Sequence, residues 1–429
     1  MANPAQVFTR GYVRRVVDAE LDELFGQLPA VLLDGPKGVG KTATARQRSR
    51  SVRRLDIAAQ AAVVDANPDV VAIGEPPVLI DEWQRVPTVW DAVRRLVDDD
   101  PSGGRFLVTG SPPGPGTHSG AGRIATIRMR PLAFSERFDL TPAVSVNRLL
   151  AGDRTLAATG SPFGLEDYVN EIIAGGFPGM RHLRGRALTQ QLDGYLDHIV
   201  DRDLPEAGFA VRRPDTVRSW MRANAAATAT TASWETIRDA ATSGVADKPA
   251  RRTTAVYTDL LSALRVLDPI PAWQPTRNHL SRLTAAPKHH LADPALAARL
   301  LDRTTSHLLA GQEGPVAVPR DGTLLGALFE SMAALSVRTF AQAAGARTYH
   351  LRTEGGRQEI DLILEREGGV VAIEVKLSHN VDDTTVRHLR WLANIIGDDL
   401  IDMIVITTGP EPYRRRDGIG VVPLGALGL

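Results

Sequence analysis

The sequence contains no cysteine. This absence excludes disulfide bonds, thiolate metal sites and a cysteine nucleophile. No apolar run approaches the roughly 18 residues that a membrane span needs, and the first fifteen residues, MANPAQVFTRGYVRR, lack the apolar core of a secretory signal. We therefore expect a cytoplasmic protein without a membrane-spanning segment.

An excess of charge of either sign is also absent. The 50 Lys and Arg residues balance the 50 Asp and Glu residues, and the isoelectric point is about 7.2. A uniformly basic nucleic-acid binder is thus excluded, whereas local basic patches remain open. The chain also has no internal repeat and no guanine-reading Asn-Lys-x-Asp motif, which argues against a GTPase.

The length of 429 residues indicates about three domains, at roughly 150 residues per domain. We place their boundaries at residues 1–140, 141–305 and 306–429. The first region alternates short apolar runs with helical patterns, which is typical of an α/β fold with a parallel sheet covered by helices. The second region is helical, and strand-like alternation returns after residue 345. The apolar run AVLLDG is the first expected strand of this region, and three more are expected at residues 77–82, 105–111 and 126–130.

The stretch GPKGVGKT at residues 35–42 fits the P-loop pattern, and it follows an apolar strand and precedes a helical segment. Glycines in such a loop let backbone N–H groups point at phosphate oxygens. Lys41 is expected to neutralise the outer phosphates, and the Thr42 hydroxyl to ligate Mg²⁺. An ordinary glycine-rich turn is the alternative. The sequence therefore predicts ATP and Mg²⁺ as cofactors, held by Gly35, Pro36, Lys37, Gly38, Val39, Gly40, Lys41 and Thr42.

A second element of the same site is PPVLIDEWQ, which ends a buried strand at Asp81 and Glu82. Ligands of open α/β sheets lie at the carboxyl ends of the strands. Asp81 suits the acidic group that holds the metal, and Glu82 suits the group that orients and deprotonates the attacking water. A solvated helix start is the alternative for Asp-Glu alone, but the pairing with a P-loop strengthens the nucleotide interpretation.

Two further polar positions are candidates for this site. Thr109 or Ser111 could sense the γ-phosphate, and a hydroxyl that caps the following turn is the alternative. Arg123 stands where an arginine finger supplied to a neighbouring subunit of a homo-oligomer is expected, and its alternative is a solvated loop arginine. Ser111 is taken as a nucleotide contact and Arg123 as a catalytic residue.

Several motifs together resemble one family in order and spacing. They are the P-loop, VLIDE, LVTGS, AGRIATIRMRPLAFSE, GGFPG, YLDHIVDRDL and EIDLILEREGGVVAIEVK. The chain is similar over nearly its whole length to prokaryotic AAA+ ATPases that carry a DUF4143 domain. The resemblance implies an AAA+ core, a helical or winged-helix middle region and a restriction-endonuclease-like C-terminal domain.

The stretch EIDLILEREGGVVAIEVK, residues 359–376, predicts a hairpin that turns at residues 367–369. Asp361 then faces Glu374 to Lys376 across strands about 5 Å apart. Two such carboxylates favour Mg²⁺ or Mn²⁺, and the Lys376 ammonium could position a metal-bound water. This resembles the PD-(D/E)xK nuclease pattern, in which Glu330 on an upstream helix matches the acidic helix residue. An exposed hairpin with a solvated Glu-x-Lys is the alternative.

The middle region reads as helix, turn, helix and apolar strand, which suits a winged helix. Arg251, Arg252, Thr253 and Tyr257 at the start of the second helix could contact phosphates. A structural spacer or a protein contact is the alternative. A basic cluster after the P-loop helix is expected to be a solvated face: Arg46, Arg48, Arg50, Arg53 and Arg54.

Two functions compete on these observations. In the first, an Mg²⁺-dependent ATPase has a nucleic-acid-associated role. Its C-terminal domain binds DNA or RNA, with DNA favoured, and cleavage of the bound nucleic acid stays open. In the second, the protein is an ATP-driven regulatory switch or a defence or toxin-antitoxin component, acts on a partner protein, and carries a nuclease-like domain that is catalytically inactive.

Overall fold

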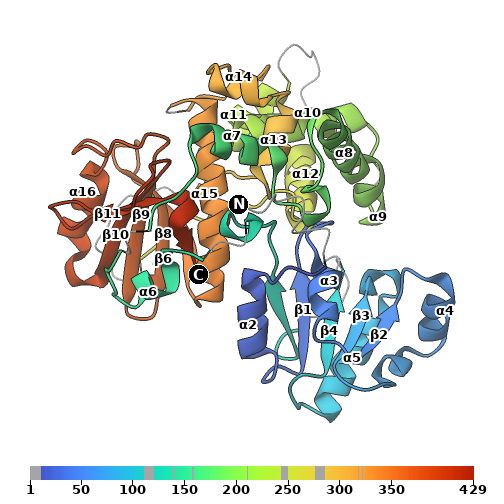
Figure 1. Ribbon diagram of the computed structural model, residues 1–429. Helices are drawn as coiled ribbons and strands as arrows, with labels where there is room; N and C mark the ends of the chain where they lie inside the picture. The colour runs from blue at the N-terminus through green and yellow to red at the C-terminus, as the bar shows by residue number, and fades with distance from the viewer. Residues whose placement is uncertain are drawn as a thin grey trace.

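The computed structural model describes residues 11–110, 120–138, 141–156, 159–209, 211–242, 250–275, 286–316, 318–320 and 322–429. Ser111, one of the predicted nucleotide contacts, lies outside these ranges. A parallel sheet from the N-terminal part, a group of helices and a second sheet occupy three corners of the molecule (Figure 1). The long helix α15, Leu324–Ala343, runs between them.

The N-terminal sheet has five parallel strands in the order β2-β3-β4-β1-β5. It confirms the predicted α/β class. The strands are β1 (Ala30–Asp34), β2 (Ser51–Arg54), β3 (Val78–Asp81), β4 (Phe106–Thr109) and β5 (Ile124–Arg128). The covering helices are α2 (Val16–Leu24), α3 (Lys41–Arg46), α4 (Ala58–Ala66) and α5 (Thr88–Asp99).

Both faces of this sheet are buried, which explains the continuous apolar runs of its strands. Successive side chains of a strand point to opposite faces. Leu32 therefore packs on the side of α5, against Val93, whereas Leu33 packs on the side of α2, against Leu21. Helix α5 covers its face with one apolar stripe, as an amphipathic helix does; the stripe consists of Val89, Trp90, Val93 and Val97.

The edge strand β2 was not expected from the sequence. Its residues SVRR include one apolar side chain, Val52, and none of the four is fully buried. A short edge strand needs no apolar run, so hydrophobic periodicity misses it. Arg50 and Arg54 pair with Glu75 and Asp56 at the surface, and Arg48 is not simply solvated, because it joins Asp18 and Asp22 of α2.

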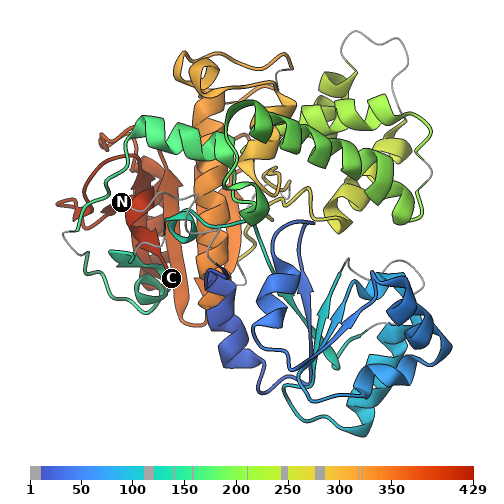
Figure 2. The ribbon, with the colours of Figure 1, turned by 45° about the vertical axis from the view of Figure 1, so that its right-hand side comes forward.

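The middle region is helical, as predicted (Figure 2). Its helices are α7 (Leu165–Ala174), α8 (Gly185–His198), α9 (Leu204–Glu206), α10 (Pro214–Ala226), α11 (Trp234–Ala241), α12 (Arg251–Ala263), α13 (Pro294–Leu300) and α14 (Thr305–Leu309), with a π-helical turn at Ile199–Asp203. After α12, two antiparallel bridges join Leu267 to Leu291 and Ile270 to Lys288. The winged-helix interpretation stays a prediction.

The C-terminal sheet is mixed, with the order β11-β12-β10-β9-β8-β7. Helices α15 and α16 (Arg387–Ile396) pack on its two faces. Arg366 pairs with Gly369, so the predicted hairpin turns at the expected place. The strands are β7 (Arg347–Arg352), β8 (Glu359–Arg366), β9 (Gly369–Val375), β10 (Leu400–Thr407), β11 (Tyr413–Arg414) and β12 (Gly420–Pro423).

A short segment after the N-terminal sheet packs with the C-terminal unit rather than with the middle region. Strand β6 (Val144–Ser145) pairs in parallel with β13 (Leu427–Gly428), and α6 (Val146–Leu150) packs against β9 and β10. The middle region thus lies, along the chain, between two parts of the C-terminal unit.

Helix α15 is long and apolar enough to cross a membrane by length and composition, but 78% of its most apolar window is buried inside the protein. Its apolar character is explained by core packing on both the middle region and the C-terminal sheet. The cytoplasmic location stays a prediction.

Candidate functional site

The P-loop connects β1 to α3 and wraps tightly. Gly38 and Gly40 have φ of 76° and 102°, which is the left-handed region that favours glycine. A Cβ on Gly35 would lie 2.1 Å from the carbonyl oxygen of Met129, so a side chain there would force β5 and the loop apart. The predicted loop conformation therefore requires these three glycines.

Lys41 lies against this loop. Its Nζ donates hydrogen bonds to the carbonyl oxygens of Gly35, at 2.7 Å, and Pro36, at 3.0 Å. Burial lowers the pKa of Lys41 to about 8, although the charges of Glu82 and Asp34 oppose this shift. An ammonium that is costly to keep charged in a buried site is well suited to a phosphate anion. The chemistry of this donor fits ATP.

Asp81 joins three elements at the carboxyl ends of the strands. Its Oδ1 accepts hydrogen bonds from Thr42 Oγ1, at 2.7 Å, and Thr109 Oγ1, at 2.5 Å. Asp81 and Thr109 are direct neighbours in the sheet register. A hydroxyl and a carboxylate at this edge are the oxygen ligands that Mg²⁺ prefers. The structure thus brings together the residues predicted for the metal, and Thr109 contacts Asp81 instead of capping a turn.

Glu82 follows Asp81 in a left-handed conformation, with φ of 58°, which is uncommon for a residue with a side chain. Its Oε2 accepts a hydrogen bond of 2.5 Å from Gln84 Nε2. The influence of its charge on the pKa of Lys41 places it beside the P-loop. Strained backbone of this kind clusters at functional sites. The role of Glu82 as a base stays a prediction.

Arg123 lies away from the nucleotide site of its own chain. It precedes β5, and β5 runs parallel to β1, so Arg123 stands at the amino ends of the strands, opposite the P-loop. Its Nε donates to Asp98 Oδ1 at 2.8 Å on α5. Because the P-loop is at the other edge, Arg123 does not reach its own nucleotide site, and an action on a neighbouring subunit stays a prediction.

Lys37 of the P-loop points at the middle region instead of lying over the loop. Its Nζ is 2.6 Å from Oδ1 of Asp203 and 3.5 Å from Oε2 of Glu206. Tyr195 donates a hydrogen bond of 3.2 Å to the carbonyl oxygen of Lys37. No motif in the sequence indicates this connection between the loop and the π-helical turn.

The ion pairs of Asp34 and Asp268 form a second connection between the nucleotide site and the rest of the chain. Asp34 ends β1 next to the P-loop, and its Oδ2 is 2.7 Å from Arg265 and 3.3 Å from Arg128. Asp268, on the segment after α12, pairs with three arginines, and their charges hold its pKa well below the usual range despite burial. These arginines are Arg128, Arg130 and Arg338, the last of which is on α15.

The predicted C-terminal residues do meet in space. They lie around a cavity of about 580 Å³ that is lined by Glu330, Asp361, Glu374 and Lys376 among others. The Lys376 Nζ is 3.3 Å from Oε2 of Glu374, and the backbone N–H of Val375 donates to Oδ2 of Asp361 at 2.9 Å. The hairpin and α15 therefore build the cluster that their sequence pattern predicted.

Lys288 is a member of this cluster that the sequence analysis missed. Its Nζ lies 2.9 Å from Glu330, 3.0 Å from Glu359 and 2.9 Å from Asp361, and the residue is 1% exposed. Its surroundings in the sequence, APKHHLADP, match no motif that we recognised. In the described part of the chain, no group of three or more His, Asp or Glu side chains is arranged to hold a metal ion. The metal site predicted at Glu330, Asp361 and Glu374 does not fit this arrangement.

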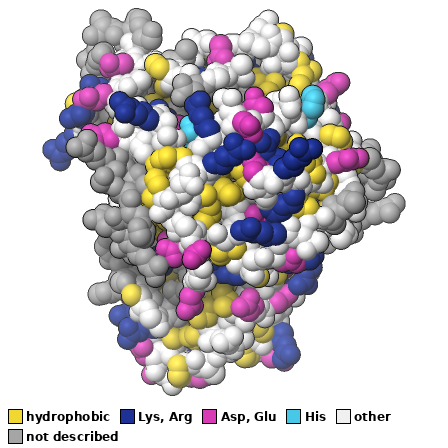
Figure 3. Space-filling view, turned by 90° about the vertical axis from the view of Figure 1, so that its left-hand side faces the viewer, with side chains coloured by type: hydrophobic (Ala, Val, Ile, Leu, Met, Phe, Trp, Pro, Cys, Tyr) yellow, Lys and Arg dark blue, Asp and Glu magenta, His cyan; other side chains and the backbone are white. Residues whose placement is uncertain are grey.

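Basic side chains also line the C-terminal cavity, among its carboxylates. They are those of Arg320, Arg352, Lys376 and Arg387. On the face that lies at the left of Figure 1, Lys and Arg side chains gather near the middle with acidic side chains among them (Figure 3). The basic patches are therefore local, in agreement with the balanced net charge.

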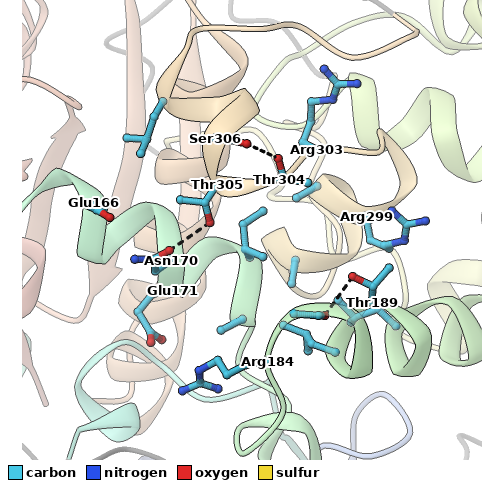
Figure 4. A pocket seen from close by; sticks show the side chains of 18 residues that line it. Glu166, Asn170, Glu171, Arg184, Thr189, Arg299, Arg303, Thr304, Thr305 and Ser306 are labelled. Atoms are coloured by element: carbon cyan, nitrogen blue, oxygen red, sulfur yellow. Dashed lines mark hydrogen bonds between the residues drawn. The ribbon is translucent and has the colours of Figure 1, made fainter.

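Another cavity, of about 800 Å³, lies among α7, α8, α13 and α14 (Figure 4). Thr305 donates a hydrogen bond of 3.1 Å to Asn170 at its wall, and Arg184, Arg299 and Arg303 surround it. None of the predicted site residues lines this cavity.

The residues of the middle region that were expected to contact phosphate differ in their exposure. Arg251 and Arg252 are exposed at the start of α12, and Arg251 pairs with Glu235 at 2.5 Å. Tyr257 is 6% exposed and packs edge-on against Phe209. The predicted contact of Tyr257 with phosphate is therefore wrong, because its position faces the core of the helices.

Three family models match successive parts of the chain. Residues 27–138 match an AAA domain, residues 165–307 match DUF8612, a domain of unknown function, and residues 325–427 match DUF4143, also a domain of unknown function. The AAA match contains the P-loop, Asp81 and Glu82, and the DUF4143 match contains Glu330 and the hairpin of Asp361.

Two curated relatives are each 26% identical to this chain over 427 residues. They are the uncharacterized proteins Mb2031c of Mycobacterium bovis and Rv2008c of Mycobacterium tuberculosis. The alignments cover 96% of this chain and 83% of each relative.

Two solved structures are more distant. The Walker-type ATPase PABY2304 of Pyrococcus abyssi matches with a TM-score of 0.37 and 16% identity, over 67% of this chain and 96% of its own. The ORC2 protein of Aeropyrum pernix matches with a TM-score of 0.29 and 17% identity, over 69% and 96%.

The parallel sheet, the P-loop and the AAA match define the class as an ATPase-like AAA domain protein. Its particular combination is this AAA domain with a DUF4143 domain, which confirms that part of the resemblance. The restriction-endonuclease-like fold and nuclease activity stay predictions.

Proposed function

We propose that the protein hydrolyses ATP in an Mg²⁺-dependent reaction at the carboxyl edge of its parallel sheet. The observation that carries this proposal is the convergence of Thr42 and Thr109 on Asp81 beside Lys41. Lys41 and the loop N–H groups hold the phosphates, and Mg²⁺ held at Thr42 and Asp81 offsets the charge of the phosphate oxygens. Glu82 orients the attacking water and accepts its proton.

We further propose that the nucleotide state is transmitted to the C-terminal domain, so that the protein acts as an ATP-driven switch. Asp34, directly before the loop, and Lys37, within it, are both paired with residues of the middle region. Asp268 then connects Arg128 of β5 to Arg338 of α15. Such ion pairs are discrete contacts that two nucleotide states can form or break, which is the physical requirement for coupling.

Two kinds of target are candidates for the switch: nucleic acid and a partner protein. The arginines and the lysine that line the C-terminal cavity support nucleic acid, since Arg and Lys neutralise backbone phosphates.

The test is the steady-state rate of ATP hydrolysis by the full chain, with Mg²⁺ and after chelation. Lys41→Ala is the negative control, because it removes the phosphate-binding ammonium. Hydrolysis that needs both Mg²⁺ and Lys41 supports the first proposal, and a rate that Lys41→Ala leaves unchanged contradicts it.

The same assay is repeated with single-stranded and with duplex DNA. An increase in rate with DNA supports a nucleic-acid target. An Arg387→Gln variant, altered only at the wall of the C-terminal cavity, should lose that increase and keep the basal rate. A rate of hydrolysis that DNA does not change would favour a protein partner as the target.

A further inference from the structure

Lys288 occupies the centre of the C-terminal carboxylate cluster. We infer that the Lys288 ammonium is the resident cation of this cluster and closes it to divalent metal ions. The inference concerns the C-terminal domain alone, and it does not depend on whether the N-terminal domain hydrolyses ATP.

The first argument is the number of carboxylates that Lys288 contacts. Its Nζ has three N–H donors, and carboxylates from three positions lie at 2.9 to 3.0 Å from it. These are Glu330 of α15 and Glu359 and Asp361 of β8. A divalent metal needs several oxygens of this kind at 2.0 to 2.6 Å, and here a single ammonium already satisfies them.

The second argument is that both oxygens of Asp361 already accept a hydrogen bond from a buried donor. Its Oδ1 accepts from Lys288, and its Oδ2 accepts from the backbone N–H of Val375. A metal bound between Glu330, Glu359 and Asp361 would take the position of the Lys288 ammonium and displace it. Lys288 is buried, and a buried donor left without a partner is costly.

The third argument is the position of Glu374, the other predicted metal ligand. Its Oε2 lies 3.3 Å from the Nζ of Lys376, so this carboxylate also has an ammonium beside it. Lys288 and Lys376 together place two positive charges among the carboxylates of the cluster without a metal.

The fourth argument is that the backbone fixes Lys288 in place. Its N–H donates to the carbonyl oxygen of Ile270 at 2.9 Å, and the N–H of Ile270 donates back to Lys288 at the same distance. Asp268, which binds Arg338, lies two residues before Ile270, and its N–H donates to the carbonyl oxygen of His290. Antiparallel bridges on this segment therefore hold the backbone of the lysine in place.

Mn²⁺ binding to the full chain, measured by electron paramagnetic resonance without nucleotide, tests the inference. Without nucleotide the P-loop lacks the phosphate oxygens that complete its metal site, so the C-terminal cluster is the site under test. We expect wild type to bind no Mn²⁺ that depends on Asp361, judged against Asp361→Asn. An Mn²⁺ site in wild type that Asp361→Asn abolishes would overturn the inference.

The Lys288→Met variant keeps the apolar stem and removes the charge. We expect it to gain one Mn²⁺ site, with affinity at least about tenfold above wild type, that a second change, Asp361→Asn, removes. Lys376→Met is the matched control, since it removes the more exposed lysine of the cluster, and it should gain no site. A folded Lys288→Met variant without Mn²⁺ binding contradicts the inference that Lys288 stands in the place of a metal.

A measurement on wild type covers the case in which Lys288→Met does not fold. The chain has five lysines, so reductive methylation followed by mass spectrometry can follow each one: Lys37, Lys41, Lys248, Lys288 and Lys376. We expect Lys288 to resist methylation both with and without Mn²⁺, while the half-exposed Lys376 reacts. Methylation of Lys288 that Mn²⁺ accelerates would show displacement by metal and overturn the inference.

Discussion

The ammonium of Lys37 lies 2.6 Å from the carboxylate of Asp203, and this contact ties the P-loop to the π-helical turn of the middle region. A lysine at this place of the loop was expected to contact nucleotide. In the structure it is held by a carboxylate that competes with phosphate for the same charge.

Asp203→Asn should therefore tighten ATP binding, by roughly 3- to 10-fold, the scale of about 1 kcal/mol for a partly exposed ion pair. Isothermal titration calorimetry measures the dissociation constant. Asp201→Asn is the matched control, since Asp201 lies on the same turn and pairs with Arg218 instead. Equal affinities for wild type and Asp203→Asn would show that the pair does not restrain Lys37.

Glu82→Gln should keep nucleotide binding and slow hydrolysis by roughly 10²- to 10⁴-fold, the usual effect of losing a general base. The amide keeps the size of the side chain but cannot accept the proton. Single-turnover hydrolysis of radiolabelled ATP measures the step. Glu75→Gln, an exposed residue that pairs with Arg50, is the control and should be unaffected. Unchanged turnover in Glu82→Gln would remove Glu82 from this role.

ATP binding should weaken as pH rises above about 8, because the pKa of Lys41 is lowered to about 8 by burial. Only the charged ammonium attracts phosphate, so at higher pH binding has to be accompanied by proton uptake. Calorimetry between pH 7.5 and 9.5, in buffers of different ionisation enthalpy, measures that uptake. Lys41→Arg stays charged over this range, and its affinity should not follow the same pH profile.

The free energy of unfolding should fall as pH falls below about 6.5. Burial and the charge of Lys288 lower the pKa of His350 from 6.5 to about 4. Between these values the unfolded chain binds a proton that the folded chain does not, so acid favours unfolding, by at most roughly 3 kcal/mol from this group. Burial lowers the pKa of His290 in the same direction.

Urea unfolding at pH 7 and pH 5 measures this loss. His350→Gln removes the titration of one group while its amide can still donate to the carbonyl oxygen of Ala286, the partner of His350 at 2.9 Å. The variant should lose less stability than wild type between the two pH values. An equal loss in both proteins would assign the acid sensitivity to other groups.

Asp268→Asn should destabilise the protein by roughly 3 to 5 kcal/mol, since it leaves three buried arginines without their shared carboxylate. Thermal unfolding measures the change. Asp259→Asn, an exposed position on the preceding helix α12, should leave the melting temperature unchanged. A melting temperature that Asp268→Asn does not alter would mean that the arginines find other partners.

The sequence predicted those parts of the structure that local pattern determines. Strand β1, the P-loop and the hairpin of Asp361 each have a short-range pattern, either an apolar run with glycines or alternation around Gly368-Gly369. The long-range contacts could not be predicted in this way. Lys288 reaches Asp361 across 73 positions of the chain, and no residue beside Lys288 marks it as part of the cluster.

Arg123 and Tyr257 show a related limit. Both were assigned from residue type and position along the chain. The edge of the sheet on which Arg123 stands depends on the direction of β5, and the burial of Tyr257 depends on how α12 packs. Neither property is contained in a single-residue pattern.

The pairing of β6 with β13 has a consequence for how the chain reaches its native state. Two strands of two residues each join positions 144–145 to 427–428, so nearly the whole middle region lies inside one closed loop. Closing so long a loop costs conformational entropy before any contact repays it. During synthesis the N-terminal sheet can form from its own strands, whereas β6 must wait for the last residues of the ladder to leave the ribosome.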